Sequence, residues 1–143
     1  MGVLHSVAVA AVIVNNAGDV LLTRRADNQQ WDIPGGVLEL DEDIITGLKR
    51  EALEETGLII DPVTLTGVYK NMTRKVVCLV FHCKPVDGAL SLNEEVIGFH
   101  WASPSETTVM LNEAIGVRVT DALTAESPAV RGHDGVHLLT EKK

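Results

Sequence analysis

The segment Gly36–Leu58, GVLELDEDIITGLKREALEETGL, decides how this chain is interpreted. Its acidic start around Asp41 suits the cap and first turn of a helix, where carboxylates accept hydrogen bonds from free backbone N–H groups. Gly57 suits the left-handed position just past a helix end. The pattern therefore predicts a helix from near Asp41 to Gly57, preceded by the turn-forming run Pro34-Gly35-Gly36.

Three carboxylates of this helix lie close to its apolar side. At 100° per residue, Glu55 falls inside the apolar stripe, and Glu51 and Glu54 fall along its edge. The stripe consists of Ile44, Ile45, Leu48 and Ala52. An unpaired charge on the inward face of a helix is unfavourable, so Glu55 must be protonated, paired or bound to a metal.

Oxygen ligands of this kind favour hard cations, Mg²⁺ first and Mn²⁺ next. Arg50 lies one helical turn before Glu54 and is positioned to orient a carboxylate. The alternative is a solvated acidic helix whose glutamates only keep the chain soluble. The histidines show no spacing typical of a zinc site.

The residues on either side of this segment predict strands and further helices. The apolar run Val7–Val14 and the run Val20–Arg25 read as two strands that form a hairpin. After the helix, we expect strands at 58–70, 75–84 and 95–101, with a turn at 85–88. Ser103 and Pro104 predict the start of a helix that continues, with a break, to about Leu123. The order of these elements predicts one mixed α/β domain spanning residues 1–143.

Composition excludes some partners. The chain has 143 residues, 12 Lys and Arg against 20 Asp and Glu, and a net charge of −8, which disfavours binding to nucleic acid or anionic membranes. No apolar run reaches the roughly 18 residues of a membrane span. Cys78 and Cys83 are an odd number of residues apart in one strand, so they face opposite sides and do not form a disulfide. We therefore expect a reducing, cytoplasmic location.

The quoted segment resembles the signature of a known family. Gly36, Glu42 and the run Arg50–Leu58 fill every fixed position of the Nudix box, G-x5-E-x7-R-E-U-x-E-E-x-G-U, where U is apolar. The similarity extends to the approach to the box, from Leu21 through Trp31, and covers roughly residues 5–125. The resemblance implies the Nudix fold, a mixed β-sheet sandwiched between α-helices. It also implies hydrolysis of a nucleoside diphosphate linked to another group, with Mg²⁺ or Mn²⁺.

The resemblance also assigns roles to residues of the box. Glu51, Glu54 and Glu55 are the expected metal ligands, together with the carbonyl of Gly35, and Glu42 is an accessory carboxylate. Arg50 is expected to orient a catalytic glutamate through a charge-assisted hydrogen bond. The family takes its general base from the box or from a later loop; Glu54 or Glu51 is favoured here. Glu94 and Glu95 are the later candidates for the base or for an extra ligand, or they form only a polar turn.

The substrate is harder to predict, because specificity lies outside the box. Thr73 and Val76 stand where family members specific for ADP-ribose and for diadenosine polyphosphates carry Pro and Tyr, and the signature of the NADH hydrolases is absent. The coenzyme A signature is only partly present. Elimination leaves a nucleoside triphosphate pyrophosphohydrolase, with an ADP-ribose or nucleotide-sugar pyrophosphatase as the alternative. A non-catalytic domain that senses a nucleotide or binds a protein is the alternative from another class.

A few residues outside the box are candidates for contacts with the substrate. Arg24 and Arg25 end a strand and suit phosphate, although either is equally consistent with a solvated strand end. Trp31 suits stacking on a base, or packing against its own loop. Dimers are common in the family, so the resemblance leaves a homodimer open, with residues 129–139 either pairing with a second subunit or closing a pocket.

Overall fold

The apolar run near the N-terminus forms a strand covered on both faces. In the computed structural model, which describes residues 3–139, this run is β1 (Ser6–Ile13). From Ala8 onward its residues alternate between two apolar clusters. Ala8, Ala10 and Val12 belong to one cluster, and Val9, Ala11 and Ile13 belong to a second cluster on the opposite face. A strand buried on both sides reads as a continuous apolar run, which is what the sequence shows.

The predicted strands and helices follow in the expected order. The other strands are β2 (Val20–Arg25), β3 (Trp31–Asp32), β4 (Gly35–Val37), β5 (Leu58–Asn71), β6 (Val76–Gly88), β7 (Val96–Ala102) and β8 (Ala129–His133). The helices are α1 (Ile44–Thr56), α2 (Pro104–Met110) and α3 (Glu113–Thr124). The sequence does not predict β3, β4 or β8. The run expected to form a turn instead enters β4, because Gly35 and Gly36 pair with Ala10 and Val9 at the edge of the larger sheet.

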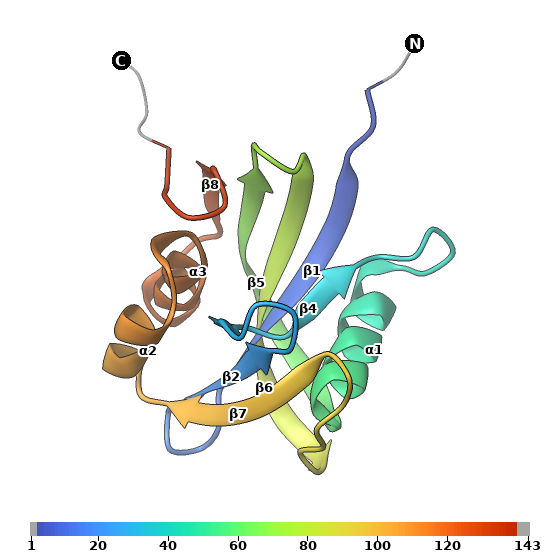
Figure 1. Cartoon of the computed structure of the whole chain (residues 1–143), viewed down its shortest axis with the longest axis vertical. Helices are drawn as coiled ribbons and strands as arrows, with labels where there is room; N and C mark the ends of the chain where they lie inside the picture. Colours follow the sequence, from blue (N-terminus) through green and yellow to red (C-terminus); the bar gives the residue numbers. More distant parts are fainter. Residues whose placement is uncertain (1–2, 140–143) are drawn as a thin grey trace.

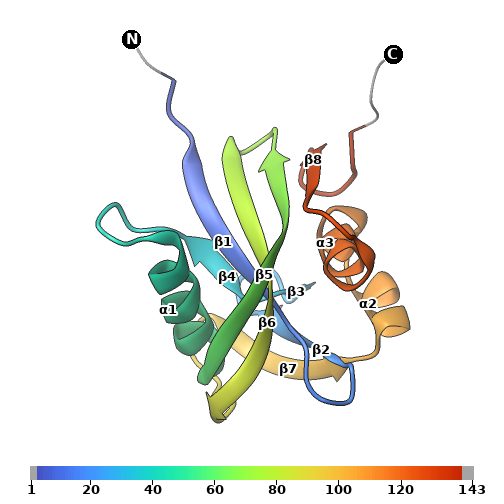
Figure 2. The ribbon, with the colours of Figure 1, turned by 180° about the vertical axis from the view of Figure 1, so that it is seen from behind.

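The strands form two sheets with helices on either side. The larger, mixed sheet has the order β4-β1-β6-β5-β8, with β1 parallel to β6 and β5 parallel to β8. The smaller sheet has the order β3-β2-β7 and is antiparallel. Figures 1 and 2 show α1 on one side of the molecule and α2 and α3 on the other. This sandwich confirms the predicted fold class.

The two apolar clusters lie between the larger sheet and its helices. Leu48 and Ala52 of α1 pack on the face that carries Val9 and Ala11. Val119 of α3 packs on the opposite face. Cys78 belongs to the α3 side and Cys83 to the α1 side, and both are free thiols, as the odd separation in the strand predicts.

Two predictions about strand connections are wrong. The expected hairpin between β1 and β2 is reduced to one antiparallel bridge, Val14 to Val20, because the strands then diverge into different sheets. Residues 85–88 are not a turn, since β6 continues through them in register with the start of β5. Pro85 is tolerated there because it lies beyond Cys83, the last β6 residue that pairs with β1, and close to a register shift.

Helix α1 has the predicted kinds of cap at both ends, but its N-cap is two residues later than expected. Asp43, rather than Asp41, caps α1 by accepting from the Thr46 N–H at 2.8 Å. Gly57 ends the helix with φ of 84°. The helix starts two residues later than Asp41 suggested, which leaves Ile44 and Ile45 about 40% exposed and outside the buried stripe.

The second helical region breaks as expected. Ser103 and Glu106 form a reciprocal capping box at the start of α2, with Pro104 in its first turn. Asn112 caps α3 and so marks the break. No helix within residues 3–139 is both long and apolar enough to cross a membrane.

The C-terminal segment completes the larger sheet. β8 adds to the edge of the sheet by pairing with β5, from Gly67 with Ala129 to Asn71 with His133. His133 is 2% exposed and contacts α3. Residues 129–133, whose role the sequence did not decide, therefore pack against their own chain.

Candidate functional site

Arg50 binds three carboxylates, one in the loop before α1 and two on α1 itself. Its guanidinium binds Glu42 at 2.7 Å and 2.8 Å, and Glu51 and Glu54 at 3.0 Å each. Glu42 precedes the helix, and its carboxylate also accepts from the Glu39 N–H at 2.9 Å. These bonds, and above all the one to Arg50, lower the pKa of Glu42 to about 2. Arg50 therefore ties the loop before the helix to the acidic side of the helix.

Glu55 faces inward, where the helical projection places it. One of its carboxylate oxygens accepts from the Gly35 N–H at 2.8 Å. Burial, reinforced by the nearby charges of Glu51, Asp32 and Glu95, raises its pKa to about 7, against the hydrogen bond from Gly35. Burial also raises the pKa of Glu51. These carboxylates are close enough to repel one another, which is the condition that a bound cation relieves.

The Pro-Gly-Gly loop lies directly against these carboxylates. A Cβ atom on Gly36 would lie 2.4 Å from the Glu51 carboxyl carbon, and one on Gly35 would lie 2.3 Å from the Val9 carbonyl oxygen. Only glycine lets the backbone approach this closely. Gly36 thus brings the β4 backbone against Glu51 of α1, and Gly35 lets the same strand lie close to β1.

The residues present fit a hard divalent cation. Glu51 lies against Gly36 and Glu55 accepts from the Gly35 N–H, so both carboxylates flank the same stretch of β4. Glu54 lies one helical turn from Arg50, which also binds Glu51. Within the described part of the chain, no three acidic, His or Cys side chains already converge on a single point, because Arg50 and the Gly35 N–H engage the glutamates. The surplus of negative charge around Glu55 is what suits Mg²⁺ or Mn²⁺.

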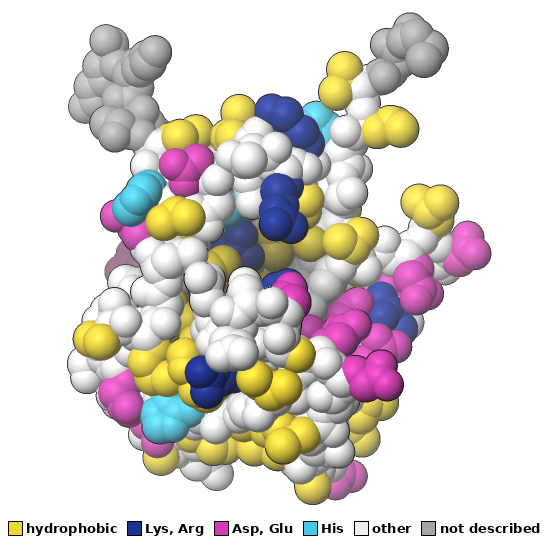
Figure 3. All heavy atoms as spheres, in the orientation of Figure 1, with side chains coloured by type: hydrophobic (Ala, Val, Ile, Leu, Met, Phe, Trp, Pro, Cys, Tyr) yellow, Lys and Arg dark blue, Asp and Glu magenta, His cyan; other side chains and the backbone are white. Residues whose placement is uncertain are grey.

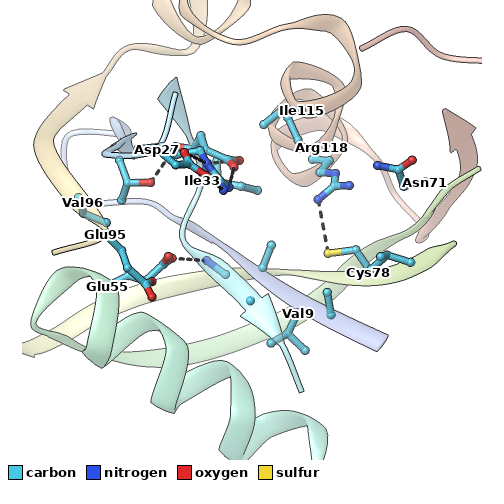
Figure 4. Close-up of a pocket in the computed structure, with 18 of the residues that line it drawn as sticks. Val9, Asp27, Ile33, Glu55, Asn71, Cys78, Glu95, Val96, Ile115 and Arg118 are labelled. Atoms are coloured by element: carbon cyan, nitrogen blue, oxygen red, sulfur yellow. Dashed lines mark hydrogen bonds and ion pairs between the residues drawn. The ribbon is translucent and has the colours of Figure 1, made fainter. Parts of the chain in front are cut away.

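A cavity of about 680 Å³ opens beside these groups. Gly35, Gly36, Glu55 and Glu95 line it, and Arg118 of α3 lines it as well. In Figure 4, Glu55 and Glu95 lie on one side of the cavity and Arg118 on the other. Figure 3 shows acidic side chains gathered over the flank that α1 occupies in Figure 1, next to a hollow with Lys or Arg side chains. A volume of this size holds a ligand as large as a nucleotide.

The candidate substrate residues from the sequence lie in different places. Arg25 lines the cavity, where it binds Asp27 at 2.7 Å and Asp32 at 3.3 Å. Arg24 donates to the Gln29 carbonyl at 3.0 Å and does not line the cavity. Trp31 also lies outside the lining and meets the His100 ring edge-on, with 6.2 Å between the ring centres.

Sequence reasoning missed Asp32 and Arg118, which both line the cavity. A signal for Arg118 exists in the sequence. It lies four residues after Ala114 and three after Ile115, both apolar residues of α3 packed in the core, so the 3.6-residue period places a charged side chain on the apolar stripe. Asp32 carries no such signal, since it stands in a loop-like run beside Pro34.

Comparisons with known proteins agree on one family. The model of the NUDIX domain matches residues 4–122. A MutT-like protein of Streptomyces ambofaciens is 49% identical over 136 residues, 95% of this chain and 88% of the relative. The nucleoside triphosphatase NudI of Escherichia fergusonii is 30% identical, over 66% of this chain and 79% of its own. The crystal structure of a MutT protein from Methanosarcina mazei superposes with a TM-score of 0.72 at 30% identity, covering 81% of this chain and 91% of that one.

Proposed function

The chain belongs to the NUDIX family and is a pyrophosphohydrolase, and from this premise we propose that it hydrolyses nucleoside triphosphates with Mg²⁺. The observation that carries the proposal is that Glu55 and the Gly35 backbone line a cavity of about 680 Å³, with the Glu51 carboxylate beside them against Gly36. This part of the cavity suits the charged phosphates of the substrate, and the cavity beyond it suits the rest of a nucleotide.

Each group of the box has a proposed task. Glu51, Glu54, Glu55 and the Gly35 carbonyl hold the metal, and Glu95, which lines the same cavity, is an accessory carboxylate. When bound, Mg²⁺ or Mn²⁺ neutralises phosphate charge and makes a bound water more acidic. Arg50 is a positioning residue, because its bonds at 3.0 Å to Glu51 and Glu54 fix the direction of both carboxylates. Glu42 holds Arg50 in turn, at 2.7 Å.

The general base is Glu54 or Glu51. A base must reach solvent water and remain ionised, and the Glu54 side chain is 59% exposed whereas that of Glu51 is 14% exposed. Exposure favours Glu54, since Arg50 binds both carboxylates at the same distance of 3.0 Å. Burial raises the pKa of Glu51, which suits a group that exchanges protons near neutral pH.

Nucleoside triphosphates are proposed as the substrate class for two reasons. The cavity accommodates one nucleotide, and the NudI relative is a nucleoside triphosphatase. ADP-ribose and nucleotide sugars are the main alternative substrates. Coenzyme A and dinucleoside polyphosphates are further substrates of the family to be tested. We also propose a reducing, cytoplasmic location, which the two free, buried thiols support. The proposed assembly is a homodimer, which light scattering would test.

The test is a panel of these substrates, assayed for phosphate-containing products with Mg²⁺, with Mn²⁺ and with chelator. We expect turnover of at least one nucleoside triphosphate only when metal is present. The variant Glu54→Gln should lower kcat by about a hundredfold or more. Its control is Glu126→Gln, which alters an exposed carboxylate outside the cavity. Faster turnover of ADP-ribose than of every triphosphate would refute the proposed substrate class, and a near-normal Glu54→Gln would remove Glu54 from the mechanism.

A further inference from the structure

Arg118 is a buried cation without a carboxylate partner. It is 8% exposed and lines the cavity from α3. None of the ion pairs among residues 3–139 includes it. A guanidinium taken out of water needs acceptors for its five N–H groups, so this arrangement is unfavourable unless a ligand supplies them.

The protein gives Arg118 only weak partners. Its Nη1 lies 3.4 Å from the Cys78 sulfur, a poor acceptor, and its Nε is buried with no hydrogen-bond partner among the described residues. The guanidinium carbon lies 5.2 Å from the centre of the Tyr69 ring, a contact that offers the cation a π face but no lone pair. Figure 4 shows the side chain extending from α3 toward Cys78 at the edge of the cavity.

His133, the third partner of Arg118, does not supply the missing hydrogen-bond acceptor. Its Nε2 lies 3.1 Å from Arg118 Nη2, and its Nδ1 accepts from the Gly135 N–H at 3.0 Å. Burial lowers the pKa of His133, and the charge of Arg118 lowers it further, so the ring is neutral. A neutral imidazole has one acceptor nitrogen. It can serve Gly135 or Arg118, and so one N–H group here lacks an acceptor.

Asp32 presents the opposite chemistry on another wall of the same cavity. Burial raises the pKa of Asp32, while the charge of Arg118 acts to lower it. The two groups therefore interact electrostatically, although they do not form an ion pair. One Asp32 oxygen accepts from the Ile33 N–H at 2.8 Å and the other meets Arg25 at 3.3 Å. Each carboxylate oxygen has a second lone pair, and the Asp32 side chain is 24% exposed, so it can accept from a ligand.

The rest of the lining is mixed. Its apolar members include Ala8, Ala10, Ile33, Val96 and Ile115, and its other polar or charged members include Thr23, Arg25, Asp27, Asn71, Arg74 and Glu94. An apolar surface with a few placed donors and acceptors suits a flat, neutral ring whose edge carries both kinds of group. Asp32, Glu55 and Glu95 line the same cavity and disfavour an anion that no metal neutralises.

We propose that Arg118 and Asp32 are specificity-determining residues that select a nucleobase with a carbonyl oxygen next to a ring N–H. Arg118 donates to the carbonyl oxygen through its Nη groups, and Asp32 accepts from the N–H. Guanine, hypoxanthine, uracil and thymine carry this edge; adenine lacks the carbonyl, and cytosine lacks the adjoining N–H. A carbonyl oxygen has two lone pairs and can accept from either or both Nη groups. In DNA an arginine also donates to guanine O6, with N7 as its second acceptor. The inference rests on the proposed function, which places a nucleotide in this cavity.

The test measures equilibrium binding, so it does not depend on turnover. Isothermal titration calorimetry with Mg²⁺ compares the α,β-methylene analogues of GTP and ATP, and of UTP and CTP. We expect the carbonyl-bearing member of each pair to bind at least about tenfold more tightly. In Arg118→Met the ratio within each pair should fall to about one, while affinity for the ATP analogue changes by less than about threefold. Arg118→Lys keeps the charge without the fork and should retain part of the preference.

The control is Lys84→Met, which removes an exposed cation outside the cavity and should leave every ratio unchanged. Circular dichroism and thermal melting report whether each variant is folded. If Arg118→Met does not fold, the wild-type ratios and Arg118→Lys still decide the question. Equal binding within both pairs by the wild type, or an equal loss on all four analogues in Arg118→Met, would overturn the proposal and leave the proposed hydrolysis standing. No binding of any analogue together with no turnover of any triphosphate would refute the substrate class itself.

Discussion

Glu55 links the stability of the fold to the proposed metal site. The Glu55 carboxylate lies on the inward side of α1, close to Glu51, and accepts from the Gly35 N–H. Its folded-state pKa of about 7 lies above the ordinary value of 4.5, so the folded state holds the proton more tightly than the unfolded state does. Ionising Glu55 in the absence of a cation therefore destabilises the fold.

We expect the metal-free protein to lose stability as the pH rises from about 5 to about 7.5. Burial of Glu55 is the main reason, and the loss is at most about 3 kcal/mol, since each pKa unit corresponds to about 1.4 kcal/mol and the side chain is partly solvated. Urea unfolding in chelator at several pH values measures it. Glu55→Gln should flatten the profile and Glu126→Gln should not, and Mg²⁺ at pH 7.5 should stabilise the wild type more than Glu55→Gln. A profile as steep in Glu55→Gln as in the wild type would contradict this assignment.

Among the elements, α1 depends most on how it ends. Gly57 has φ of 84°, and a Cβ there would lie 2.2 Å from the Ala89 carbonyl oxygen. The left-handed end turns the chain sharply into β5 and sets the direction of α1 relative to the sheet. Gly18 has the same φ of 84° with nothing within 4 Å of a Cβ, so it provides a matched comparison.

Replacing each of these glycines with alanine separates backbone strain from steric clash. Gly18→Ala should destabilise by about 1–2 kcal/mol, from the left-handed conformation alone. Gly57→Ala should destabilise by at least about 1 kcal/mol more, because the methyl group also meets a carbonyl oxygen. Equilibrium urea denaturation of both variants provides the comparison. Equal losses would show that the structure around Ala89 adapts to the methyl group.

At the scale of the whole molecule, one network joins both the sheet and its edge strand to α3. Asp121 of α3 accepts from the Tyr69 hydroxyl of β5 at 2.7 Å and from two nitrogens of Arg131 of β8, each at 2.8 Å. Asp121 is 5% exposed. The network holds α3, and with it Arg118, in position over the cavity.

Breaking this network should affect stability more than breaking an exposed ion pair. Asp121→Ala should destabilise by about 2–3 kcal/mol, because it leaves the Tyr69 hydroxyl and Arg131 without their acceptor. Tyr69→Phe should destabilise by about 1 kcal/mol, and the double variant by less than the sum, since both changes remove the same bond. Asp27→Ala, which breaks the exposed pair with Arg25, should change stability by less than about 1 kcal/mol. Strict additivity of the two Asp121–Tyr69 changes would show that the hydroxyl bond contributes nothing.

The sequence by itself determined most of the local elements and the spacing of the acidic residues on α1. The period of the apolar residues, the cap before α1, Gly57 and the break before α3 are set within a few residues of chain, and so they can be read directly. The spacing of Glu51, Glu54 and Glu55 on one helix, with Arg50 beside them, is equally local.

Only the tertiary structure decided what faces those carboxylates. The divergence of β1 and β2 into separate sheets, the pairing of β8 with β5 and the position of Asp32 relative to Arg118 join residues far apart in the sequence. Arg118 differs from an ordinary helical arginine because β6 places Cys78, β5 places Tyr69 and β8 places His133 against its buried guanidinium, and none of these is a carboxylate. Contacts of this kind follow from how sheets and helices pack, and no short pattern of residues encodes them.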